Sequence, residues 1–517
     1  MRCVLAVLSL AAASVASAAG PRVEIVIGEK APALERRAAE ELAGDLKRLY
    51  QADVHLAAEA PANAANLILV GSPDTNGAIK SLGDRWPKLS EQGHVVRSVK
   101  VNDRPALLVG GGSPAATFWA AAELAHQWGI RAMLYGDVDP VAPPEFSIED
   151  FDIVMEPRAK IRAWMMDFDS PIGPATWSLA NQKKLLRQLA RLKFNSLILN
   201  TSGKTPAAVL AAFDRIPVSG DTAGRSAFGG AKHFENPDLA AADSDAARQK
   251  AGEELIRGFE REASALGMSF HKKQAIDQAE RALNGGLLPM VYMGHERFAE
   301  DLKRKRNAIG IEPARLSDGD LWAFLHSRNF FDAKFTGGHP IHDLVTPICG
   351  DGVSDRVLKA FELAEEATKL INAGDKALSA PRPDVIMKHY ASTDPPPEWW
   401  GKARDNYLNA MNEMYRANTR AREGGRSYTL YFARRFEFAF EYMNCLEAVR
   451  KAGNAKSKGD QETQIAELEK AVESMNGALN AMAAVARSQS DRGIIAVLNE
   501  YGYRPLVKEL DAASGSQ

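Results

Sequence analysis

The sequence predicts an α/β protein in three parts: a small α+β N-terminal domain, a central (β/α) barrel and a C-terminal α-helical domain. First, strand-like and helix-like segments alternate as far as about residue 395, which is typical of α/β domains. Second, the segment from about 157 to 395 is close in length to a typical barrel of roughly 250 residues. Third, the pattern from residue 396 onward is helical throughout.

The chain begins with the pattern of a secretory signal. In MRCVLAVLSLAAASVASAAG, Arg2 precedes an apolar segment, and small residues allow cleavage near Ala18 or Ala19. The apolar segment is well short of the roughly 20 residues that span a bilayer, which argues against the alternative of a membrane anchor. We therefore expect residues 1–19 to be removed and the mature protein to be secreted or periplasmic, without a membrane span.

Charge and cysteine content exclude several classes of protein. The chain has 64 Lys and Arg residues against 66 Asp and Glu residues, for a net charge of -2, and the two signs are interspersed. A basic surface for nucleic acid is therefore not expected. Cys349 and Cys445 remain after the signal is removed. Two cysteines in so long a secreted chain do not make a disulfide framework, so they are either free buried thiols or one bridge.

Residues 20–140 are predicted to form the α+β domain. Ser113 is in place to cap a helix, with Pro114 in its first turn. The three glycines before Ser113 lack the G-x-G-x-x-G order, which favours a tight structural turn over a phosphate site, and no cofactor is expected. The expected strands lie at 23–27, 54–57, 66–71, 95–101, 106–112 and 131–135, and the expected helices at 32–50 and 113–128.

This domain carries a resemblance in three stretches: IVIGEKAPALERRAAEELAGDLKRLY, NLILVGSPDTN and ALLVGGGSPAATFWAAAELAHQWGIRAMLYGD. In their order and in the G-G-G-S-P turn they resemble the small N-terminal domain of α-glucuronidases of glycoside hydrolase family 67 and of β-hexosaminidases. In those families this accessory domain precedes a catalytic (β/α)8 barrel. The resemblance implies a carbohydrate substrate without implying which reaction. After the stretch SLILNT the sequence lacks the consecutive Asp-Glu pair of β-hexosaminidases, so neither activity transfers residue by residue.

The barrel-like region, residues 159–395, follows a linker at 141–158 that is rich in Pro and acidic residues. It opens with a strand–helix–strand unit at 160–201, whose first apolar run ends at Asp167 and Asp169. Chemistry in such α/β folds lies beyond the carboxyl ends of the strands. Further strands are expected in PMVYMGHE, LVTPICGDG and DVIMKHY. Five or six strands are credible rather than eight, so an incomplete or irregular barrel stays an alternative.

Residues 396–517 are predicted to be a helical domain, with long helices at 399–423, 427–451 and 461–487. Apolar residues in the third helix recur with alternating spacings of three and four, which indicates a packing seam. The family 67 α-glucuronidases also have a C-terminal helical domain, so the resemblance extends to this part in outline.

Glycoside hydrolysis generally needs two carboxyl groups that converge from different strand ends. Asp351, in the glycine-flanked turn of LVTPICGDG, is the first candidate, and capping of the following helix is its alternative role. Glu296 follows an apolar run and sits beside His295, and its alternative role is a first-turn charge on the next helix. Glu235 in KHFEN is a further candidate. We expect Asp351 and Glu296 to be the catalytic pair.

Substrate binding is expected at other residues. One of Asp167 and Asp169, at the end of the first strand, is expected to enter the pocket and bind substrate hydroxyls, and the other to be solvated. Trp177 is the expected stacking platform for a sugar ring, although a tryptophan is more often buried. His339 and His342 in GGHPIHD are expected to bind sugar hydroxyls or simply to pack. A metal is not expected there, because H-E-x-x-H is absent and a proline indicates a loop.

Three hypotheses follow from these patterns. The first is a secreted glycoside hydrolase that acts on a polysaccharide or oligosaccharide through a pair of carboxyl groups. The second is a lapsed enzyme that keeps the scaffold and binds carbohydrate at the same rim. The third is a scaffolding protein that assembles through its C-terminal helices, and the oligomeric state is left open.

Overall fold

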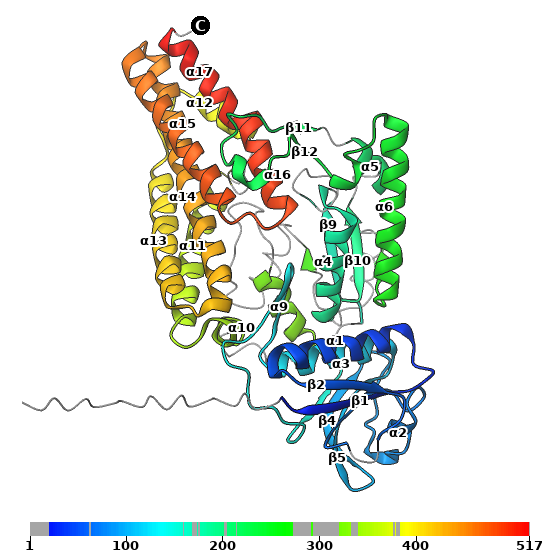
Figure 1. The fold of residues 1–517 in the computed structure, drawn as a ribbon. Coiled ribbons are helices and arrows are strands. Elements are labelled where there is room, and N and C mark those ends of the chain that lie inside the picture. Colours follow the sequence, from blue (N-terminus) through cyan, green and yellow to red (C-terminus); the bar gives the residue numbers. More distant parts are fainter. Residues whose placement is uncertain are drawn as a thin grey trace, which may run out of the picture.

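The computed structural model shows a mixed α/β protein (Figure 1). Its described residues form a six-stranded sheet, a four-stranded sheet, two short antiparallel pairs and a large helical part. The structure describes residues 20–61, 64–158, 160–167, 173, 176–200, 204–212, 215–271, 291–292, 320–331, 340–375, 378 and 383–515.

The N-terminal unit is a six-stranded sheet in the order β2-β1-β3-β5-β4-β8. The pairs among β2, β1, β3 and β5 are parallel, whereas β4 runs antiparallel to β5 and to β8. Helices α1 and α3 bury their apolar faces, including Leu42 and Leu124, in one core with this sheet. The elements are β1 (Arg22–Ile27), α1 (Ala33–Tyr50), β2 (Asp53–Ala57), β3 (Asn66–Gly71), α2 (Gly77–Lys80), β4 (His94–Val101), β5 (Arg104–Gly111), α3 (Pro114–Gln127) and β8 (Asp152–Met155).

The start of α3 has the predicted cap. The Ser113 side chain accepts a hydrogen bond of 3.2 Å from the backbone N–H of Ala116, and Pro114 occupies the first turn. A Cβ atom at Gly111 would lie 2.4 Å from the backbone of Ala116. The glycine stretch is therefore a close approach of strand and helix, which confirms the structural interpretation of this turn.

The predicted linker at 141–158 is not only a connection. Its residues 152–155 form β8, which adds an edge strand to the N-terminal sheet by pairing with β4. Phe151 supports the same edge, because its carbonyl accepts a hydrogen bond of 2.8 Å from the backbone N–H of Ser98. A strand of four residues is too short for its alternation to show in a stretch rich in Pro and acidic residues.

The central part contains the predicted strand–helix–strand unit. β9 (Ala163–Asp167), α4 (Leu179–Arg191) and β10 (Ser196–Asn200) lie in a sheet whose described strands have the order β13-β10-β9-β14. All three pairings are parallel, so β9 has a parallel neighbour on both sides. The other elements here are α5 (Pro206–Ala212), α6 (Asp245–Ala265), β13 (Ser269–His271) and β14 (Val291–Tyr292).

Two further predicted strands are helices. LVTPIC belongs to α10 (Pro340–Cys349) and DVIMKHY to α12 (Pro383–Tyr390). In α10 the buried residues Ile341, Leu344, Val345 and Ile348 recur at helical spacing, and they pack against α11 (Ser354–Gly374) and the C-terminal helices. Each apolar run was too short for its length to separate a strand from a buried helix. The prediction of strands in these two places was therefore wrong.

The C-terminal part is helical as predicted, and its core extends into the middle of the chain. Its buried side chains form one cluster with α10 and α11 and with Ile216, Val218 and Phe234, which lie between β10 and α6. In the described residues no helix is long and apolar enough to cross a membrane. The helices are α13 (Glu398–Arg420), α14 (Glu423–Ser457), α15 (Gln461–Ala483), α16 (Gln489–Leu498) and α17 (Arg504–Ser514), with the π-helix η6 (Asn499–Tyr503) before α17.

The N-terminal unit packs against the amino ends of the parallel strands. Arg162, just before β9, donates a hydrogen bond of 2.5 Å to the side chain of Gln92, and its guanidinium lies 4.5 Å from the ring centroid of Trp119. Glu123 of α3 is fully buried and binds Lys193, which precedes β10, as well as Arg328 at the end of α9 (Asp320–Asn329). The carboxyl ends of β9 and β10 therefore face away from the N-terminal unit, toward α16 (Figure 1).

Candidate functional site

The carboxyl edge of the parallel sheet is the place where the fold offers a site. β9 ends at Asp167 and β10 at Asn200, and the backbones of these two residues are register partners. β13 ends beside them at His271, whose register partner on β10 is Ile198. In parallel α/β folds, loops beyond this end of the strands carry the functional residues. The structure thus places Asp167 at the edge where the sequence analysis expected it.

Trp177 lies in the turn that leads from this edge into α4, and its ring is buried. Only 3% of the residue is exposed. Its indole N–H donates a hydrogen bond of 2.9 Å to the hydroxyl of Ser490, and its ring centroid lies 5.8 Å from that of Tyr135. A ring covered in this way offers no open face to a sugar. The expectation that Trp177 is a stacking platform for a sugar ring is therefore corrected: its ring packs inside the protein.

The segment at 215–242, which follows β10 and α5, forms the wall beside this turn. It contains the antiparallel pair β11 (Ile216–Pro217) and β12 (His233–Phe234). The Asn236 side chain donates a hydrogen bond of 3.0 Å to the carbonyl of Trp177, and a carboxylate oxygen of Asp238 accepts one of 2.6 Å from the backbone N–H of Leu179. The segments that follow β9 and β10 are therefore tied to each other.

Glu235, one of the candidate carboxylates, lies in this wall and is ion-paired. One of its oxygens is 2.8 Å from Nε of Arg215 and 3.4 Å from a terminal nitrogen of Arg248. Two guanidinium groups therefore bind this carboxylate, which is the arrangement of a structural ion pair.

Side chains of the C-terminal helices bind the backbone of the same wall. Asn499 donates to the carbonyl of Ala223 at 2.8 Å and accepts from its N–H at 2.9 Å. Arg492 donates to the carbonyl of Ala227 at 2.7 Å, and Gln489 donates to the carbonyl of Glu235 at 3.1 Å. A buried backbone N–H or C=O group that loses its hydrogen-bond partner costs free energy, so breaking these bonds would be unfavourable. The wall and the helices α16 and η6 therefore form one structural unit.

The start of α16 is itself anchored by charged and aromatic side chains. Its cap residue Ser488 and Asp491 form a capping box, and Asp491 also accepts a hydrogen bond of 2.9 Å from the hydroxyl of Tyr431 on α14. The Arg487 guanidinium lies 3.6 Å from the ring centroid of Tyr431 and 4.7 Å from that of Tyr135. Tyr135 belongs to the hairpin of β6 (Arg131–Met133) and β7 (Gly136–Val138). Arg487 therefore joins the N-terminal unit to the helical part.

Asp320, at the start of α9, completes this anchor. It is 1% exposed; one carboxylate oxygen accepts a hydrogen bond of 2.6 Å from the backbone N–H of Leu134, and the other lies 2.8 Å from the Arg487 guanidinium. Burial raises the pKa of Asp320 to about 7, and burial also lowers the pKa of Arg487. The low polarity that shifts both groups strengthens their direct hydrogen bond.

Asp351 lies elsewhere. It occupies an exposed turn between α10 and α11, not the end of a strand, and the cap of α11 is Val353 without a side-chain hydrogen bond. The turn lines a cleft of about 850 Å³ together with 139–141, the segment after β7, and Arg422. The backbone N–H of Val141 bonds to the carbonyl of Pro347 at 2.8 Å, and α10 lies beside the N-terminal unit (Figure 1). The structure does not bring Asp351 to the edge that carries Asp167.

His342 also lies away from that edge, in the first turns of α10. Its Nε2 is 3.1 Å from a carboxylate oxygen of Asp355, and its side chain is 39% exposed. Within the described ranges no group of three or more His, Cys, Asp or Glu side chains could hold a metal ion. The remaining candidates, Asp169, Glu296 and His339, lie outside the described residues.

Cys349 and Cys445 are free buried thiols. Cys349 ends α10 and Cys445 lies within α14, and neither takes part in a disulfide. Burial raises the pKa of the Cys349 thiol to about 12. This decides between the two alternatives that the sequence left open.

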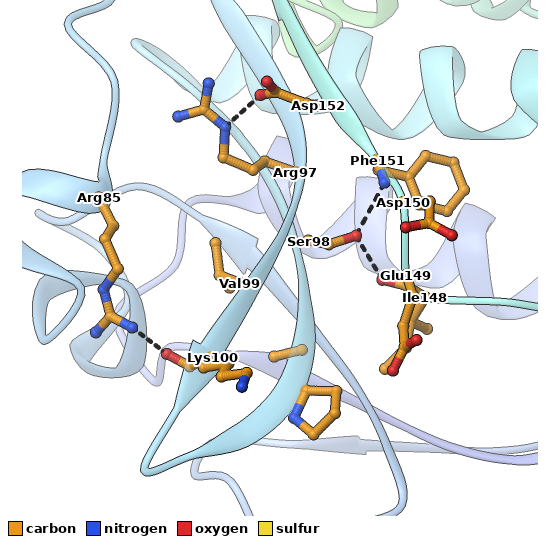
Figure 2. A pocket seen from close by; sticks show the side chains of 12 residues that line it. Arg85, Arg97, Ser98, Val99, Lys100, Ile148, Glu149, Asp150, Phe151 and Asp152 are labelled. Atoms are coloured by element: carbon orange, nitrogen blue, oxygen red, sulfur yellow. Dashed lines mark hydrogen bonds and ion pairs between the residues drawn. The ribbon is translucent and has the colours of Figure 1, made fainter.

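A second cleft, of about 880 Å³, lies on the N-terminal unit (Figure 2). It is bounded by β4 and by the segment that leads into β8. Arg97 is 2.7 Å from Asp152, Arg85 donates to the carbonyl of Lys100, and Ser98 bridges the two walls through backbone groups. Since these polar groups already bind one another or the backbone, we read the cleft as part of the packing of the N-terminal unit and not as a ligand site.

Sequence reasoning missed Gln489, Ser490 and Asn499. The pattern S-x-x-D at Ser488 signals the start of a helix, but the partners of that helix lie more than two hundred residues away in the chain. No local pattern identifies such contacts.

The comparisons with known proteins address the fold. The chain matches no protein-family model, and no curated protein matches it. Among solved structures it is similar to a family GH115 4-O-methyl-α-glucuronidase with specificity for decorated arabinogalactans, with 11% identity and a TM-score of 0.54 over 92% of this chain and 79% of that chain. The two chains share a fold.

Two other structures have lower similarity. CpGH84D has 12% identity and a TM-score of 0.40 over 88% of this chain and 90% of its own. A GH138 enzyme targeting pectin rhamnogalacturonan II has 9% identity and a TM-score of 0.44 over 95% of this chain and 98% of its own. At these scores neither adds to the argument. The resemblance to family 67 α-glucuronidases and to β-hexosaminidases stays a prediction.

Proposed function

We propose that this protein is a glycoside hydrolase whose site lies at the carboxyl edge of the parallel sheet. One observation carries the proposal: the unit β9–α4–β10 ends in the register pair Asp167 and Asn200, and the edge is walled by two tied segments and by α16. The fold shared with a GH115 α-glucuronidase supports it. We also propose that 159–395 form a (β/α) barrel, since β9 has parallel neighbours on both sides, as a strand of a closed barrel does.

The proposed chemistry uses carboxyl groups. Asp167 or Asp169 binds substrate hydroxyls at the edge, and Glu296 supplies one of the two groups that glycoside hydrolysis needs. Glu296 follows β14 in the chain, and β14 is the direct neighbour of β9. Residues that follow neighbouring parallel strands meet at the same end of a sheet. Asp351 is left out of this proposal because it lies beside the N-terminal unit.

The test is an activity screen with three variants. The full chain is assayed on aryl glycosides, with glucuronides and hexosaminides included, and on acidic and neutral plant polysaccharides. Glu296→Gln is expected to lower kcat/KM by about a hundredfold or more, the usual order for a lost general acid or base. Asp167→Asn is expected to lower it by about tenfold, the order for one lost hydrogen bond between a carboxylate and a substrate hydroxyl. Asp351→Asn is the matched control and should stay within about twofold of wild type. A loss confined to Asp351→Asn would place the chemistry elsewhere.

A second candidate function is a lapsed enzyme that only binds carbohydrate. The observation that favours it is the ion pairing of Glu235 with Arg215 and Arg248, because this described wall carboxylate is thereby engaged in structure. Affinity electrophoresis on the same polysaccharides separates the two functions. Retarded migration without hydrolysis of any substrate, lost in Asp167→Asn, would support the binding protein and contradict the hydrolase.

A further inference from the structure

We propose that Ser490 and Gln489, at the start of α16, are positioning residues that set the wall of the site from the C-terminal part of the chain. The link between these residues and a substrate site rests on the proposed function, whereas their contacts with the wall do not depend on it. These residues belong to a region that the sequence marks only as a helical appendage. Their role is to hold the segments that follow β9 and β10, not to touch substrate.

The contact of Ser490 reaches the first of these segments. Its hydroxyl accepts the hydrogen bond of the buried Trp177 indole, at 2.9 Å. The Trp177 carbonyl in turn accepts hydrogen bonds from Asn236 at 3.0 Å and from Gln182 at 3.2 Å. Trp177 is thus held by its ring and by its backbone, and of these three hydrogen-bond partners Ser490 comes from the C-terminal part of the chain.

The contact of Gln489 reaches the second segment. Its side-chain amide donates to the carbonyl of Glu235 at 3.1 Å. Glu235 directly precedes Asn236, which binds Trp177. Two successive residues of α16 therefore engage both ends of a short chain of hydrogen bonds that links the two segments. A shift of the start of α16 would move both walls together.

The first turn of α16 is itself held in place by contacts with other parts of the chain. Arg487 lies between the rings of Tyr135 and Tyr431 and binds the buried carboxylate of Asp320. The capping box of Ser488 and Asp491 fixes the first turn in addition. These groups come from the N-terminal unit, α9 and α14. The first turn of α16 is thereby held by three other parts of the chain. The position of the wall, which binds Ser490 and Gln489, therefore depends on these parts as well.

The experiment measures the wall directly. Hydrogen exchange of the full chain, followed by mass spectrometry, compares wild type with Ser490→Ala, Ser490→Thr and Gln464→Ala. Gln464 is the matched control, because on α15 its side chain donates a hydrogen bond of 2.8 Å to the hydroxyl of Tyr390, away from the wall. Ser490→Ala should speed exchange in peptides 176–182 and 233–240 about tenfold, the factor for one lost hydrogen bond. Ser490→Thr should restore the wild-type rate, and Gln464→Ala should leave these peptides unchanged.

Activity gives the second readout. On a substrate that the wild type cleaves, Ser490→Ala should raise KM about tenfold with kcat within about threefold, while Gln464→Ala changes neither constant. Equal exchange in wild type and Ser490→Ala, or the same acceleration in Gln464→Ala, would overturn the positioning role. If the wild type cleaves no glycoside, the proposed function fails, and the exchange comparison alone still decides the role of Ser490.

Discussion

His389 should make the helical part of this protein sensitive to acid, and replacing it with Phe should remove that sensitivity. The residue lies in α12 and is 3% exposed, with its ring edge-on to Trp400 at a centroid distance of 4.9 Å. Within the described part of the chain neither ring nitrogen makes a hydrogen bond. Burial, and then the nearby charge of Arg450, lower the pKa of His389 from 6.5 to about 4. Phe keeps the ring contact with Trp400 and cannot take up a proton.

The size of the effect follows from proton linkage. Because the pKa of His389 is lower in the folded than in the unfolded chain, the unfolded chain binds the proton first as the pH falls. The stability that the neutral ring contributes is fully present above about pH 6.5 and is lost as the pH falls toward 4. Between pH 7 and pH 5 the loss amounts to about 2 kcal/mol in the free energy of unfolding.

The assay is urea unfolding at pH 7 and at pH 5, followed by far-ultraviolet circular dichroism. The difference in unfolding free energy between the two pH values should be about 2 kcal/mol smaller in His389→Phe than in wild type. His55→Gln, at an exposed position on β2, serves as the control and should retain the wild-type difference. If His389→Phe shows the same difference as wild type, the ring is not held neutral in the folded protein and the reasoning fails.

Three further predictions concern packing and buried charge. Glu123→Gln should destabilise the protein by about 3–5 kcal/mol in a thermal melt, because Lys193 and Arg328 would lose the buried carboxylate that both bind; a change below about 1 kcal/mol would show that the cluster carries no net stability. Gly224→Ala should lower the free energy of unfolding by about 2–3 kcal/mol, since the residue has a φ of 68° and its Cβ would lie 2.7 Å from a carbonyl of α15. Gly230→Ala is the control: with a φ of 88° and nothing within 4 Å of its Cβ, it should lower that free energy by only about 1 kcal/mol. Equal costs in the two variants would contradict the packing argument. Both buried cysteines should react with a thiol reagent only after denaturation, without prior reduction; rapid labelling of the native protein would contradict their burial.

Local patterns were sufficient where the signal lies within one element or one unit. The cap at Ser113 needs only a serine before Pro114 and a helical apolar pattern, and the structure has that cap. The unit at 160–201 needs only two short apolar runs and an amphipathic helix between them. Its strands pair as predicted, and Asp167 ends the first of them. The α/β class and the carboxyl edge shared by β9 and β10 could therefore be predicted from sequence, whereas the closed barrel stays a prediction.

Local patterns failed where burial alone decides. The run around Ile348 is as apolar as a buried strand. It forms a helix instead, and the helical spacing of its apolar residues places them in one core with α11 and α14. Asp351 then falls in an exposed turn rather than at a sheet edge. Trp177 has the sequence context of a site loop, yet Ser490 and Tyr135 close over its ring. Contacts between residues so far apart in the chain leave no trace in the neighbouring sequence.

The central claim is the location of the site, and the most direct measurement is a crystal structure of Glu296→Gln with a bound oligosaccharide from the activity or binding screen. The proposed function predicts sugar density at the carboxyl ends of β9 and β10, within hydrogen-bond distance of Asp167 and beside the wall that α16 supports. Sugar bound in the cleft at Asp351, with an empty sheet edge, would contradict it.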